Sequence, residues 1–297
     1  MSSTSQEQNS SGFPAGSLTR SASSPRTLFS ILMTVLAFMC AALAILPLVA
    51  VLYYLIVKGF SSFSLKIFTE LPPPPMVAGG GFGNAIAGTV IMVGIAALIS
   101  VPFGVLAAIY LTEFSSGKTS RWIRFATNVL SGVPSIIAGV FAYGIVVALF
   151  KSFSAIAGGV ALSVLMLPII VRTTDEALQL VPQELRQASL GLGANNFETV
   201  SRVVLPAALP AIATGVTLSI ARASGETAPL LFTALFSQFW PNSLFAPTPS
   251  LAVLVYNFAI VPFKNQQDLA WAAALILVLL VLITSIFARW VTRQKVY

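Results

Sequence analysis

An arginine and a glutamate stand four positions apart in a stretch of sequence that is otherwise apolar. Arg222 and Glu226 lie within residues 221–232, ARASGETAPLLF. A charged side chain near the centre of a membrane helix costs about 2.5–3.5 kcal/mol on insertion scales, so such residues face a partner or a water-filled cavity. On a helix, this spacing places both side chains on one face and within reach of each other. The segment predicts either an ion pair that holds helices together or a polar station on a path through an apolar bundle.

The composition is typical of a polytopic membrane protein. Hydrophobic residues make up 57% of the 297 positions and charged residues 8%, whereas about a quarter of a soluble domain is charged. Histidine is absent and Cys40 is the single cysteine, so we expect no metal site, no catalytic triad and no internal disulfide. The net charge is +7, but the basic residues are scattered between apolar runs, which argues against nucleic-acid binding.

Six apolar runs are each long enough to cross a bilayer, for which about 20 residues suffice. We expect membrane helices at residues 28–57, 84–111, 123–150, 153–171, 206–236 and 269–290. The first run exceeds the apolar core of a signal peptide and no small-residue cleavage site follows it, so we expect a retained helix. The predicted fold is all-α, with about six transmembrane helices.

The chain divides into four predicted segments. Residues 1–27 form a polar tail that cannot bury enough surface to fold and is expected to be disordered and cytoplasmic. Residues 28–83 hold the first helix and an external loop, stiff at Pro72–Pro75 and flexible at Gly79–Gly81. Residues 84–290 form the core, with a cytoplasmic segment at 172–205, and residues 291–297 form a second tail.

The orientation follows from the excess of basic residues on one side. The segments assigned to the cytoplasm carry Arg20, Arg26, Lys118, Arg121, Arg124, Arg172, Arg186, Arg202, Arg289, Arg293 and Lys295, and the external ones carry Lys58, Lys66, Lys151 and Lys264. Basic residues in short loops favour the cytoplasmic side. We therefore expect both termini to be cytoplasmic.

Prolines recur in or at the ends of the predicted spans, where each removes a backbone hydrogen bond and permits a kink. They are Pro102, Pro134, Pro168, Pro206, Pro210 and Pro229. Gly225, next to Glu226, is either a local hinge or a site where a neighbouring helix approaches closely. This placement is consistent with a bundle that moves.

The segment between the fourth and fifth predicted spans is longer than a helix connection needs. Residues 182–190 are predicted to form a short amphipathic helix, with Pro182 in its first turn and Glu184 near the positive end of its dipole. Gly191 and Gly193 permit a sharp turn, after which residues 195–204 form a second helix. The alternative is a solvated connector with no docking role.

This segment resembles the EAA loop of binding-protein-dependent ABC importer permeases. The resemblance is carried by Gln187-Ala188-Ser189, Gly193-Ala194 and Leu205-Pro206. In that family the short helix docks in a cleft of a cytoplasmic ATPase and transmits ATP-driven closure to the membrane helices. The residues to which this implies a coupling role are Glu184, Gln187, Ala188, Gly193, Ala194 and Pro206. Gln187 stands where the family usually has glutamate, so no ion pair is implied there.

A longer resemblance, from about Gly83 to Arg289, is to the PstA family of phosphate importer permeases. It is carried by residues 172–176 (RTTDE), 180–182 (LVP) and 221–234, with GETAP at its centre, and by residues 133–139 (VPSIIAG), which resemble a Pro-Ser-Ile turn in the third helix of such permeases. The resemblance implies the type I ABC importer permease fold. It also implies partners: the related permease PstC, two copies of the ATPase PstB, and the external phosphate-binding protein PstS. The chain would be no enzyme and bind no cofactor, because the ATPase would use the ATP.

The residues that we assign to the substrate path are Arg222, Glu226, Arg172 and Thr227. Arg222 would lower the barrier for phosphate through charge-assisted hydrogen bonds, and Glu226 would hold the arginine until an anion displaces it. A static Arg222–Glu226 ion pair remains the alternative. Arg172 is either an exit-side station or an anchor that reaches the headgroups. Thr227 contributes a hydroxyl to the path or satisfies a backbone carbonyl one turn back.

Glu226 also predicts selectivity between oxyanions. Phosphate near neutral pH keeps a proton that it can donate to a carboxylate, whereas sulfate would face the carboxylate as a like charge. Glu226 would act as a second filter, after the external binding protein.

Other functions remain open at this point. One alternative is a permease of the same superfamily for molybdate or sulfate, against which only residues 222–229 (RASGETAP) argue. A membrane-embedded enzyme acting on a phosphorylated lipid needs a catalytic base or metal cluster, for which the isolated acidic residues give no pattern. An autonomous channel would leave the EAA-like loop unexplained.

Overall fold

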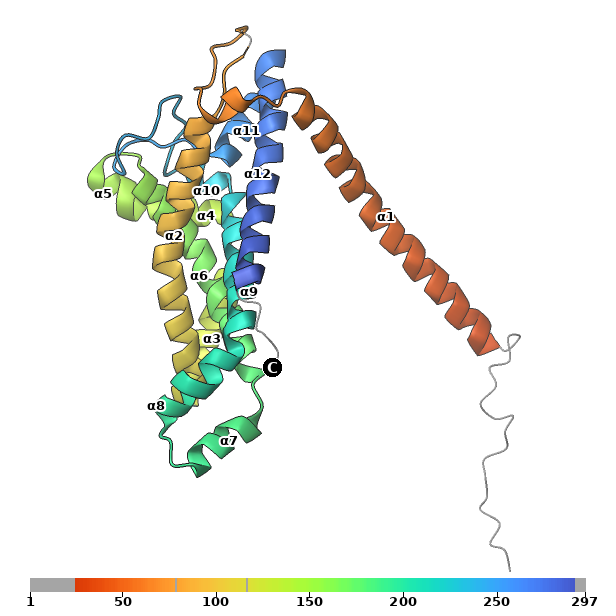
Figure 1. Ribbon diagram of the computed structural model, residues 1–297, viewed down its shortest axis with the longest axis vertical. Coiled ribbons are helices and arrows are strands. Elements are labelled where there is room, and N and C mark those ends of the chain that lie inside the picture. Colours follow the sequence, from red (N-terminus) through yellow and green to blue (C-terminus); the bar gives the residue numbers. More distant parts are fainter. Residues whose placement is uncertain (1–24, 78, 116, 292–297) are drawn as a thin grey trace, which may run out of the picture. The chain divides into compact units, whose positions relative to one another are not determined.

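The computed structural model describes residues 25–77, 79–115 and 117–291, which form helices and connecting loops (Figure 1). This confirms the predicted all-α class. The chain divides into two units, residues 1–54 and residues 55–297. Residues 1–24 of the predicted N-terminal tail and residues 292–297 of the C-terminal tail lie outside the described residues.

The first unit contains most of α1 (Pro25–Ser61). Pro25 begins the helix, where its missing N–H is no loss. The helix is apolar all round, and its large hydrophobic side chains up to Tyr54 are exposed. A helix of this kind suits a lipid or protein surrounding within a membrane.

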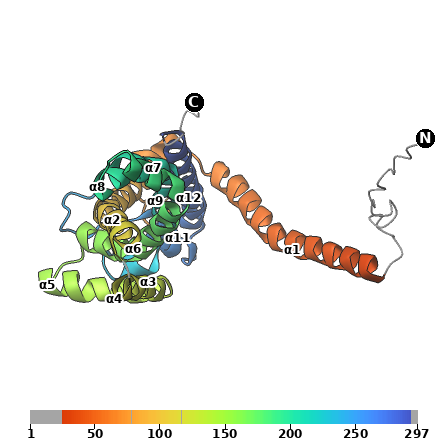
Figure 2. The same cartoon turned by 90° about the horizontal axis from the view of Figure 1, so that it is seen from below.

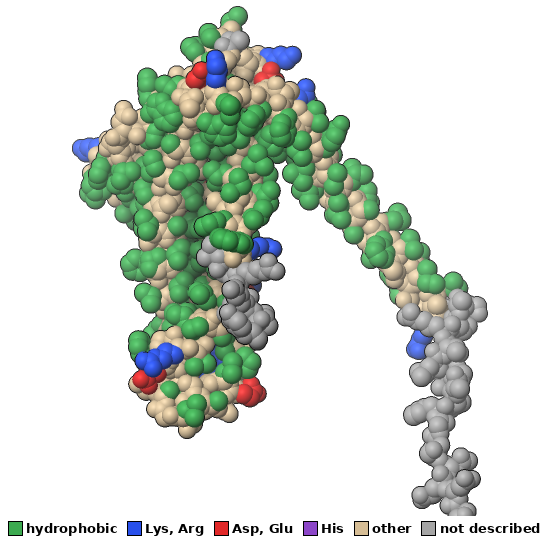
Figure 3. Space-filling model, in the orientation of Figure 1, with side chains coloured by type: hydrophobic (Ala, Val, Ile, Leu, Met, Phe, Trp, Pro, Cys, Tyr) green, Lys and Arg blue, Asp and Glu red, His purple; other side chains and the backbone are tan. Residues whose placement is uncertain are grey.

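Long helices run side by side in the second unit (Figures 1 and 2). They are α2 (Gly83–Ile109), α6 (Ala155–Gln179), α9 (Leu205–Ser224) and α12 (Lys264–Val291). A buried cluster that includes Met92, Leu162 and Met166 packs α2 against α6. Hydrophobic side chains cover the visible sides of these helices and charged side chains gather toward their ends (Figure 3), the distribution expected of helices that cross an apolar layer.

Among the described residues of the whole chain, five helices are long and apolar enough to span a membrane, and a sixth span results if one bent pair is counted together. The prediction of about six spans is therefore confirmed. The bent pair is the predicted third span, residues 123–150. It consists of α3 (Lys118–Ser131), then α4 (Ser135–Ala142), the π-helical turn η3 (Tyr143–Val147) and α5 (Ala148–Phe150).

The bend in this span measures 102° and lies at Gly132-Val133-Pro134. A proline ring disfavours the α conformation of the preceding residue, and Pro134 itself has ψ 137°, outside the helical region. The predicted span is therefore bent, at one of the prolines where the sequence indicated a possible kink.

The predicted fifth span, residues 206–236, is also broken. α9 ends at Ser224, and the short helix α10 (Ala228–Leu231) follows after Gly225, Glu226 and Thr227. Pro229 cannot donate a backbone hydrogen bond, and its ring would clash with the carbonyl four residues earlier, at Gly225. A regular helix is therefore disfavoured at the residues that carry the charged pair, although Pro102, Pro168 and Pro210 stand inside helices that continue past them.

The proline- and glycine-rich loop before α2 packs against α12. It contains the 3₁₀ turn η1 (Leu65–Phe68), whose Ile67 is buried in the core. The side-chain amide of Asn265, in the first turn of α12, donates to the carbonyl of Val77 at 2.7 Å. The loop is thus part of the folded unit, together with α11 (Leu251–Ala259), a short helix that the sequence did not predict.

The segment between the fourth and fifth predicted spans begins later than expected. α6 continues past Val171 to Gln179, so that Arg172 lies inside a helix. The predicted short helix is present as α7 (Gln183–Gly191). The second predicted helix is α8 (Asn196–Thr199), which continues through the π-helical turn η4 (Val200–Val204) directly into α9.

Candidate functional site

Arg222 and Glu226 meet across the end of α9. Glu226 Oε1 lies 3.8 Å from Arg222 Nε, which is too long for a hydrogen bond. The prediction that the two side chains can reach each other is confirmed, but the helix ends at Ser224, between the two residues. The two side chains still meet because one more helical turn follows, in which the Glu226 N–H donates to the carbonyl of Ala223 at 3.2 Å.

This charged pair is asymmetric in its exposure. The Arg222 side chain is 62% exposed and that of Glu226 is 17% exposed. The guanidinium is thus held loosely by a carboxylate that is itself mostly shielded. Such an arginine retains donors for an incoming oxyanion, because guanidinium carries five N–H groups.

The break is held in place by α4. Gly139 in α4 faces Pro229 in α10, and a side chain at Gly139 would place its Cβ 2.6 Å from the Pro229 Cα. Only glycine permits this approach. Thr227 is the N-cap of α10, is half-buried, and its side chain makes no capping hydrogen bond. The kinked third span therefore supports the segment that carries Glu226 and Thr227.

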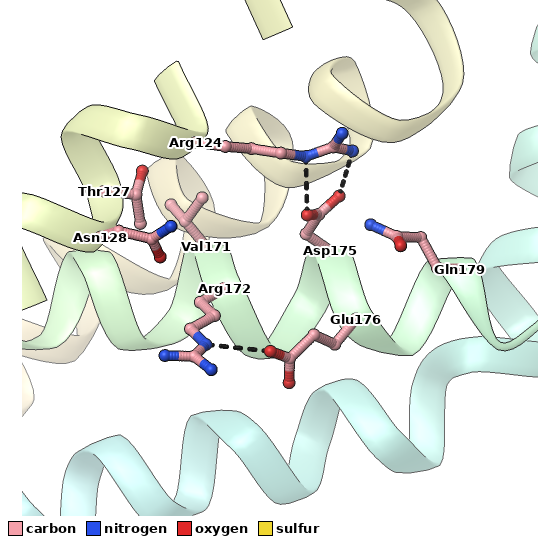
Figure 4. Close-up of a pocket in the computed structure, with 8 residues that line it drawn as sticks. All are labelled: Arg124, Thr127, Asn128, Val171, Arg172, Asp175, Glu176 and Gln179. Atoms are coloured by element: carbon pink, nitrogen blue, oxygen red, sulfur yellow. Dashed lines mark hydrogen bonds and ion pairs between the residues drawn. The ribbon is translucent and has the colours of Figure 1, made fainter. Parts of the chain in front are cut away.

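Arg172 lies in a separate pocket of about 510 Å³ (Figure 4). Its Nε donates to Glu176 Oε1 at 2.9 Å, and both side chains are 60% exposed. The pocket is lined by Arg124, Thr127, Asn128, Val171, Arg172, Asp175, Glu176 and Gln179. Arg222 is not among these residues, so the structure does not bring the two predicted arginine stations into one pocket.

The two arginines lie on neighbouring helices at different heights. Thr173, next to Arg172 in α6, packs against Gly215 in α9. Arg222 lies about two helical turns further along α9, or roughly 10 Å along its axis at 1.5 Å per residue.

Asp175 is a polar hub that the sequence analysis missed. Arg124 in α3 binds it with both ends of its fork, Nε to Oδ2 at 2.9 Å and Nη2 to Oδ1 at 2.8 Å. Thr112, in the π-helical turn η2 (Tyr110–Phe114) that ends α2, donates to Oδ1 at 2.6 Å. Figure 4 shows this pair on one side of α6 and the Arg172–Glu176 pair on the other. Asp175 thus joins α2, α3 and α6.

The predicted coupling residues lie on and after α7. Glu184, Gln187 and Ala188 are exposed, and α7 contains no buried residue. A groove of about 530 Å³ runs between α7 and the start of the next helix. It is lined by Leu185, Ala188, Ser189, Leu192, Gly193, Ala194, Glu198, Arg202 and Val203.

The turn after α7 has a defined geometry. Gly193 has φ +90°, which L side chains rarely adopt. The Gly193 N–H donates to Leu190 at 3.0 Å and the Ala194 N–H to Ser189 at 3.2 Å, the two bonds of a Schellman motif. Of the two glycines proposed for this turn, Gly193 is therefore the one that the backbone requires.

The start of α8 carries a signal that the sequence analysis overlooked. Asn195 accepts a hydrogen bond from the Glu198 N–H, and the Glu198 side chain accepts one from the Asn195 N–H, forming a capping box. The π-helical turn η4 follows immediately before Leu205. Pro206 explains it, because a proline cannot continue the regular hydrogen-bond ladder and would clash one turn back.

Arg186 was interpreted only as a topology residue, yet it forms a buried ion pair with Glu113 of η2. The Nη2 atom of Arg186 lies 2.8 Å from Glu113 Oε1, and the side chains are 12% and 9% exposed. Within the described residues, no group of three or more acidic, histidine or cysteine side chains is placed to hold a metal ion.

Comparison with known proteins agrees with this arrangement. Residues 100–296 match the family described as binding-protein-dependent transport system inner membrane component. The chain is 44% identical over 252 residues to the phosphate transport system permease protein PstA of Yersinia pestis, covering 84% of each chain. It is 41% identical over 271 residues to the protein of the same name from Pasteurella multocida, covering 91% of this chain and 96% of that one.

A solved structure supports the fold. It is titled as a bacterial alginate ABC transporter in complex with an alginate pentasaccharide-bound periplasmic protein, and it aligns with a TM-score of 0.60 at 15% identity over 91% of this chain and 96% of that chain. This likeness confirms the predicted type I ABC importer permease fold and carries no information on substrate. The sequence matches go further: the chain belongs to the binding-protein-dependent transport system inner membrane components and, within them, to the PstA family of phosphate transport system permeases.

Proposed function

We propose that this chain is the transmembrane permease subunit of an ATP-driven importer of inorganic phosphate, and that it forms half of the translocation path. The observation that carries the proposal is the loosely paired, exposed Arg222 at the break between α9 and α10. The two relatives compared above, named as phosphate transport system permeases, support the choice of substrate.

Phosphate would exchange with Glu226 at the Arg222 guanidinium. A pair separated by 3.8 Å is weakened by solvent, so an anion that offers two or three oxygens competes for the same donors. Thr227 would add a hydroxyl beside the pair. Arg172, on the adjacent helix, would receive the anion on the exit side.

The direction of transport follows from the partners that we propose. The exposed surface of α7 and the groove beside it would dock the ATPase PstB, present in two copies. The residues that we assign to this coupling are Glu184, Gln187, Ala188, Gly193, Ala194 and Pro206. A related permease, PstC, would complete the path, and PstS would deliver phosphate from outside. Both termini would then be cytoplasmic, with lipid around the bundle and no nucleic acid involved. ATP would be used by PstB, and this chain would bind no cofactor.

Glu226 would discriminate between oxyanions. Its carboxylate is mostly shielded, so a sulfate beside it would meet an unscreened like charge, whereas a protonated phosphate oxygen can donate to it. We expect Glu226→Gln to raise sulfate uptake while phosphate uptake persists. If Glu226→Gln takes up sulfate no faster than the wild type, Glu226 does not select between the two oxyanions.

The experiment is ATP-dependent phosphate uptake into vesicles that hold the four-component complex, with ATP enclosed and PstS outside. Because hydrogen bonds to charged groups contribute about 1.5–3 kcal/mol, Arg222→Ala should reduce uptake about tenfold or more in a complex that assembles. Arg289→Ala is the matched control, because Arg289 is an exposed arginine in the last turn of α12.

Unchanged uptake by Arg222→Ala would reduce the Arg222–Glu226 pair to a packing contact. An assembled wild-type complex that hydrolyses ATP but takes up no phosphate would contradict the assigned substrate, and uptake of molybdate or sulfate by the same vesicles would replace it.

A further inference from the structure

The least exposed ion pair among the described residues joins α7 to the end of α2. Arg186 binds Glu113 with two donors, Nη2 to Oε1 at 2.8 Å and Nε to Oε2 at 3.4 Å. Their side chains are 12% and 9% exposed, compared with 60% for both partners of the Arg172–Glu176 pair. A paired arginine fork fixes orientation as well as distance.

Arg186 also holds the end of α6. Its Nη2 donates to the carbonyl of Leu178 at 2.9 Å, and its Nη1 donates to the carbonyl of Val181. The last carbonyls of a helix have no partner within the helix, so one arginine side chain satisfies them and binds Glu113 at the same time. Three elements, α2, α6 and α7, therefore meet at this guanidinium.

The rest of α7 is attached differently. The helix has no buried residue, and the Ser189 hydroxyl lies 3.0 Å from that of Thr199 in α8. Because α8 continues into α9, this second contact leads to the helix that carries Arg222. Arg186 is thus the contact that ties α7 to α2 and to the end of α6.

The Glu113 end of the contact lies in the π-helical turn η2. Thr112, its neighbour in the chain, donates to the Asp175 hub at 2.6 Å, and Asp175 adjoins Glu176, the partner of Arg172. One turn of π-helix therefore connects α7 to the polar pocket around Arg172. π-helical turns interrupt the regular backbone ladder and frequently occur at functional sites.

We propose that the Arg186–Glu113 pair is the joint through which a displacement of α7 reaches α2 and α6. Both are positioning residues that contact no substrate. A bidentate pair that is shielded from solvent stays formed when α7 is displaced. An exposed ion pair instead loses its hydrogen bonds to competing water. The inference rests on the proposed function in one respect, the docking of an ATPase on α7.

The test compares coupling with assembly in vesicles that hold the four-component complex. Glu113→Gln keeps the size of the side chain and removes its charge. We expect the complex to assemble and to hydrolyse ATP at its basal rate, while phosphate transported per ATP falls about fivefold or more, in the range of coupling energies typical of linked sites. Stimulation of ATP hydrolysis by external PstS should fall in parallel, because that signal must cross the joint in the other direction.

Glu70→Gln is the matched control, because Glu70 pairs with Lys66 at 3.8 Å on an exposed surface and should leave both ratios unchanged. If the complex with Glu113→Gln does not assemble, the Arg186→Lys variant is measured instead. Lysine keeps the positive charge but cannot make the two parallel hydrogen bonds of the guanidinium. If an assembled variant transports as much phosphate per ATP as the wild type and its ATP hydrolysis responds equally to PstS, the proposal that this pair is the joint is contradicted. A wild-type complex that hydrolyses ATP in response to PstS but carries no phosphate would contradict the proposed function, and the loss of that response in Glu113→Gln would still measure the joint.

Discussion

Two arginine–glutamate pairs of the second unit differ in almost every physical respect. Arg186 and Glu113 are 2.8 Å apart and almost fully shielded, and Arg186 also binds two backbone carbonyls. Arg222 and Glu226 are 3.8 Å apart, and the arginine is largely exposed. The same two residue types therefore have different roles: the first pair is closed to any ligand, while the second leaves donors of the arginine free.

The backbone around each pair differs in the same sense. Near α7, the Schellman turn at Gly193 and the capping box of Asn195 and Glu198 satisfy both ends of the connection. Near Arg222, α9 ends at Ser224, and Pro229 disfavours a regular helix through the residues that follow. The α7 end of the unit is therefore fixed by local hydrogen bonds, and the α9–α10 segment is interrupted where the charges lie.

The largest contrast should appear when each arginine is removed. Arg186→Ala leaves Glu113 buried without a partner and should lower the free energy of unfolding by about 3–5 kcal/mol. Arg222→Ala should lower it by less than about 1 kcal/mol, as for an exposed pair. Denaturant titration of the purified chain in detergent micelles measures both. An equal loss of unfolding free energy in both variants would contradict a structural role for Arg186–Glu113 and a ligand-accessible role for Arg222–Glu226.

A second contrast uses adjacent carboxylates of α6. Asp175→Asn weakens the charged hydrogen bonds from Arg124 and Thr112 and should lower the free energy of unfolding by about 1.5–3 kcal/mol. Glu176→Gln removes only an exposed pair with Arg172 and should cost about 0–1 kcal/mol. The same titration measures the two variants. A larger loss for Glu176→Gln would show that the pocket around Arg172 is a structural element.

The smallest contrast concerns two glycines. Gly193→Ala forces alanine to φ +90° and should cost about 1–2 kcal/mol. Gly225 has φ −93°, and a Cβ there would meet nothing closer than the Arg222 carbonyl oxygen at 3.7 Å, so Gly225→Ala should stay within about 0.5 kcal/mol. If Gly225 is a hinge, its variant loses phosphate uptake without losing stability. Equal destabilisation of both variants would contradict the account.

Hydropathy predicted the long helices because a segment inside a bilayer must satisfy its own backbone groups, which favours helices. It did not predict where they break, because apolar content says nothing about backbone sterics. The signals were present: Pro134 restricts the backbone of Val133, and Pro229 lacks the N–H that a continuous helix would use and crowds the Gly225 carbonyl. The capping box at Asn195 and Glu198 was also readable from its spacing.

The polar contacts between helices were beyond local patterns. Glu113 and Arg186 are 73 positions apart, and Arg124 and Asp175 are 51 apart. A single sequence contains no signal that pairs such residues, because the contact arises only when α2, α3, α6 and α7 are packed. Arg222 and Glu226 could be paired in advance because they are neighbours on one helical turn.

The role of Arg222 can be measured by removing its positive charge and then restoring it chemically. Cys40 is the only cysteine of the chain, so Cys40→Ser provides a cysteine-free background for Arg222→Cys, assembled with partner subunits that lack reactive cysteines. Phosphate uptake is then measured before and after treatment with a cationic and with an anionic methanethiosulfonate reagent. The account predicts that Arg222→Cys loses uptake, that the cationic reagent restores part of it and that the anionic reagent does not. Wild-type uptake by the untreated variant, or equal effects of the two reagents, would contradict a role for Arg222 in the passage of an anion.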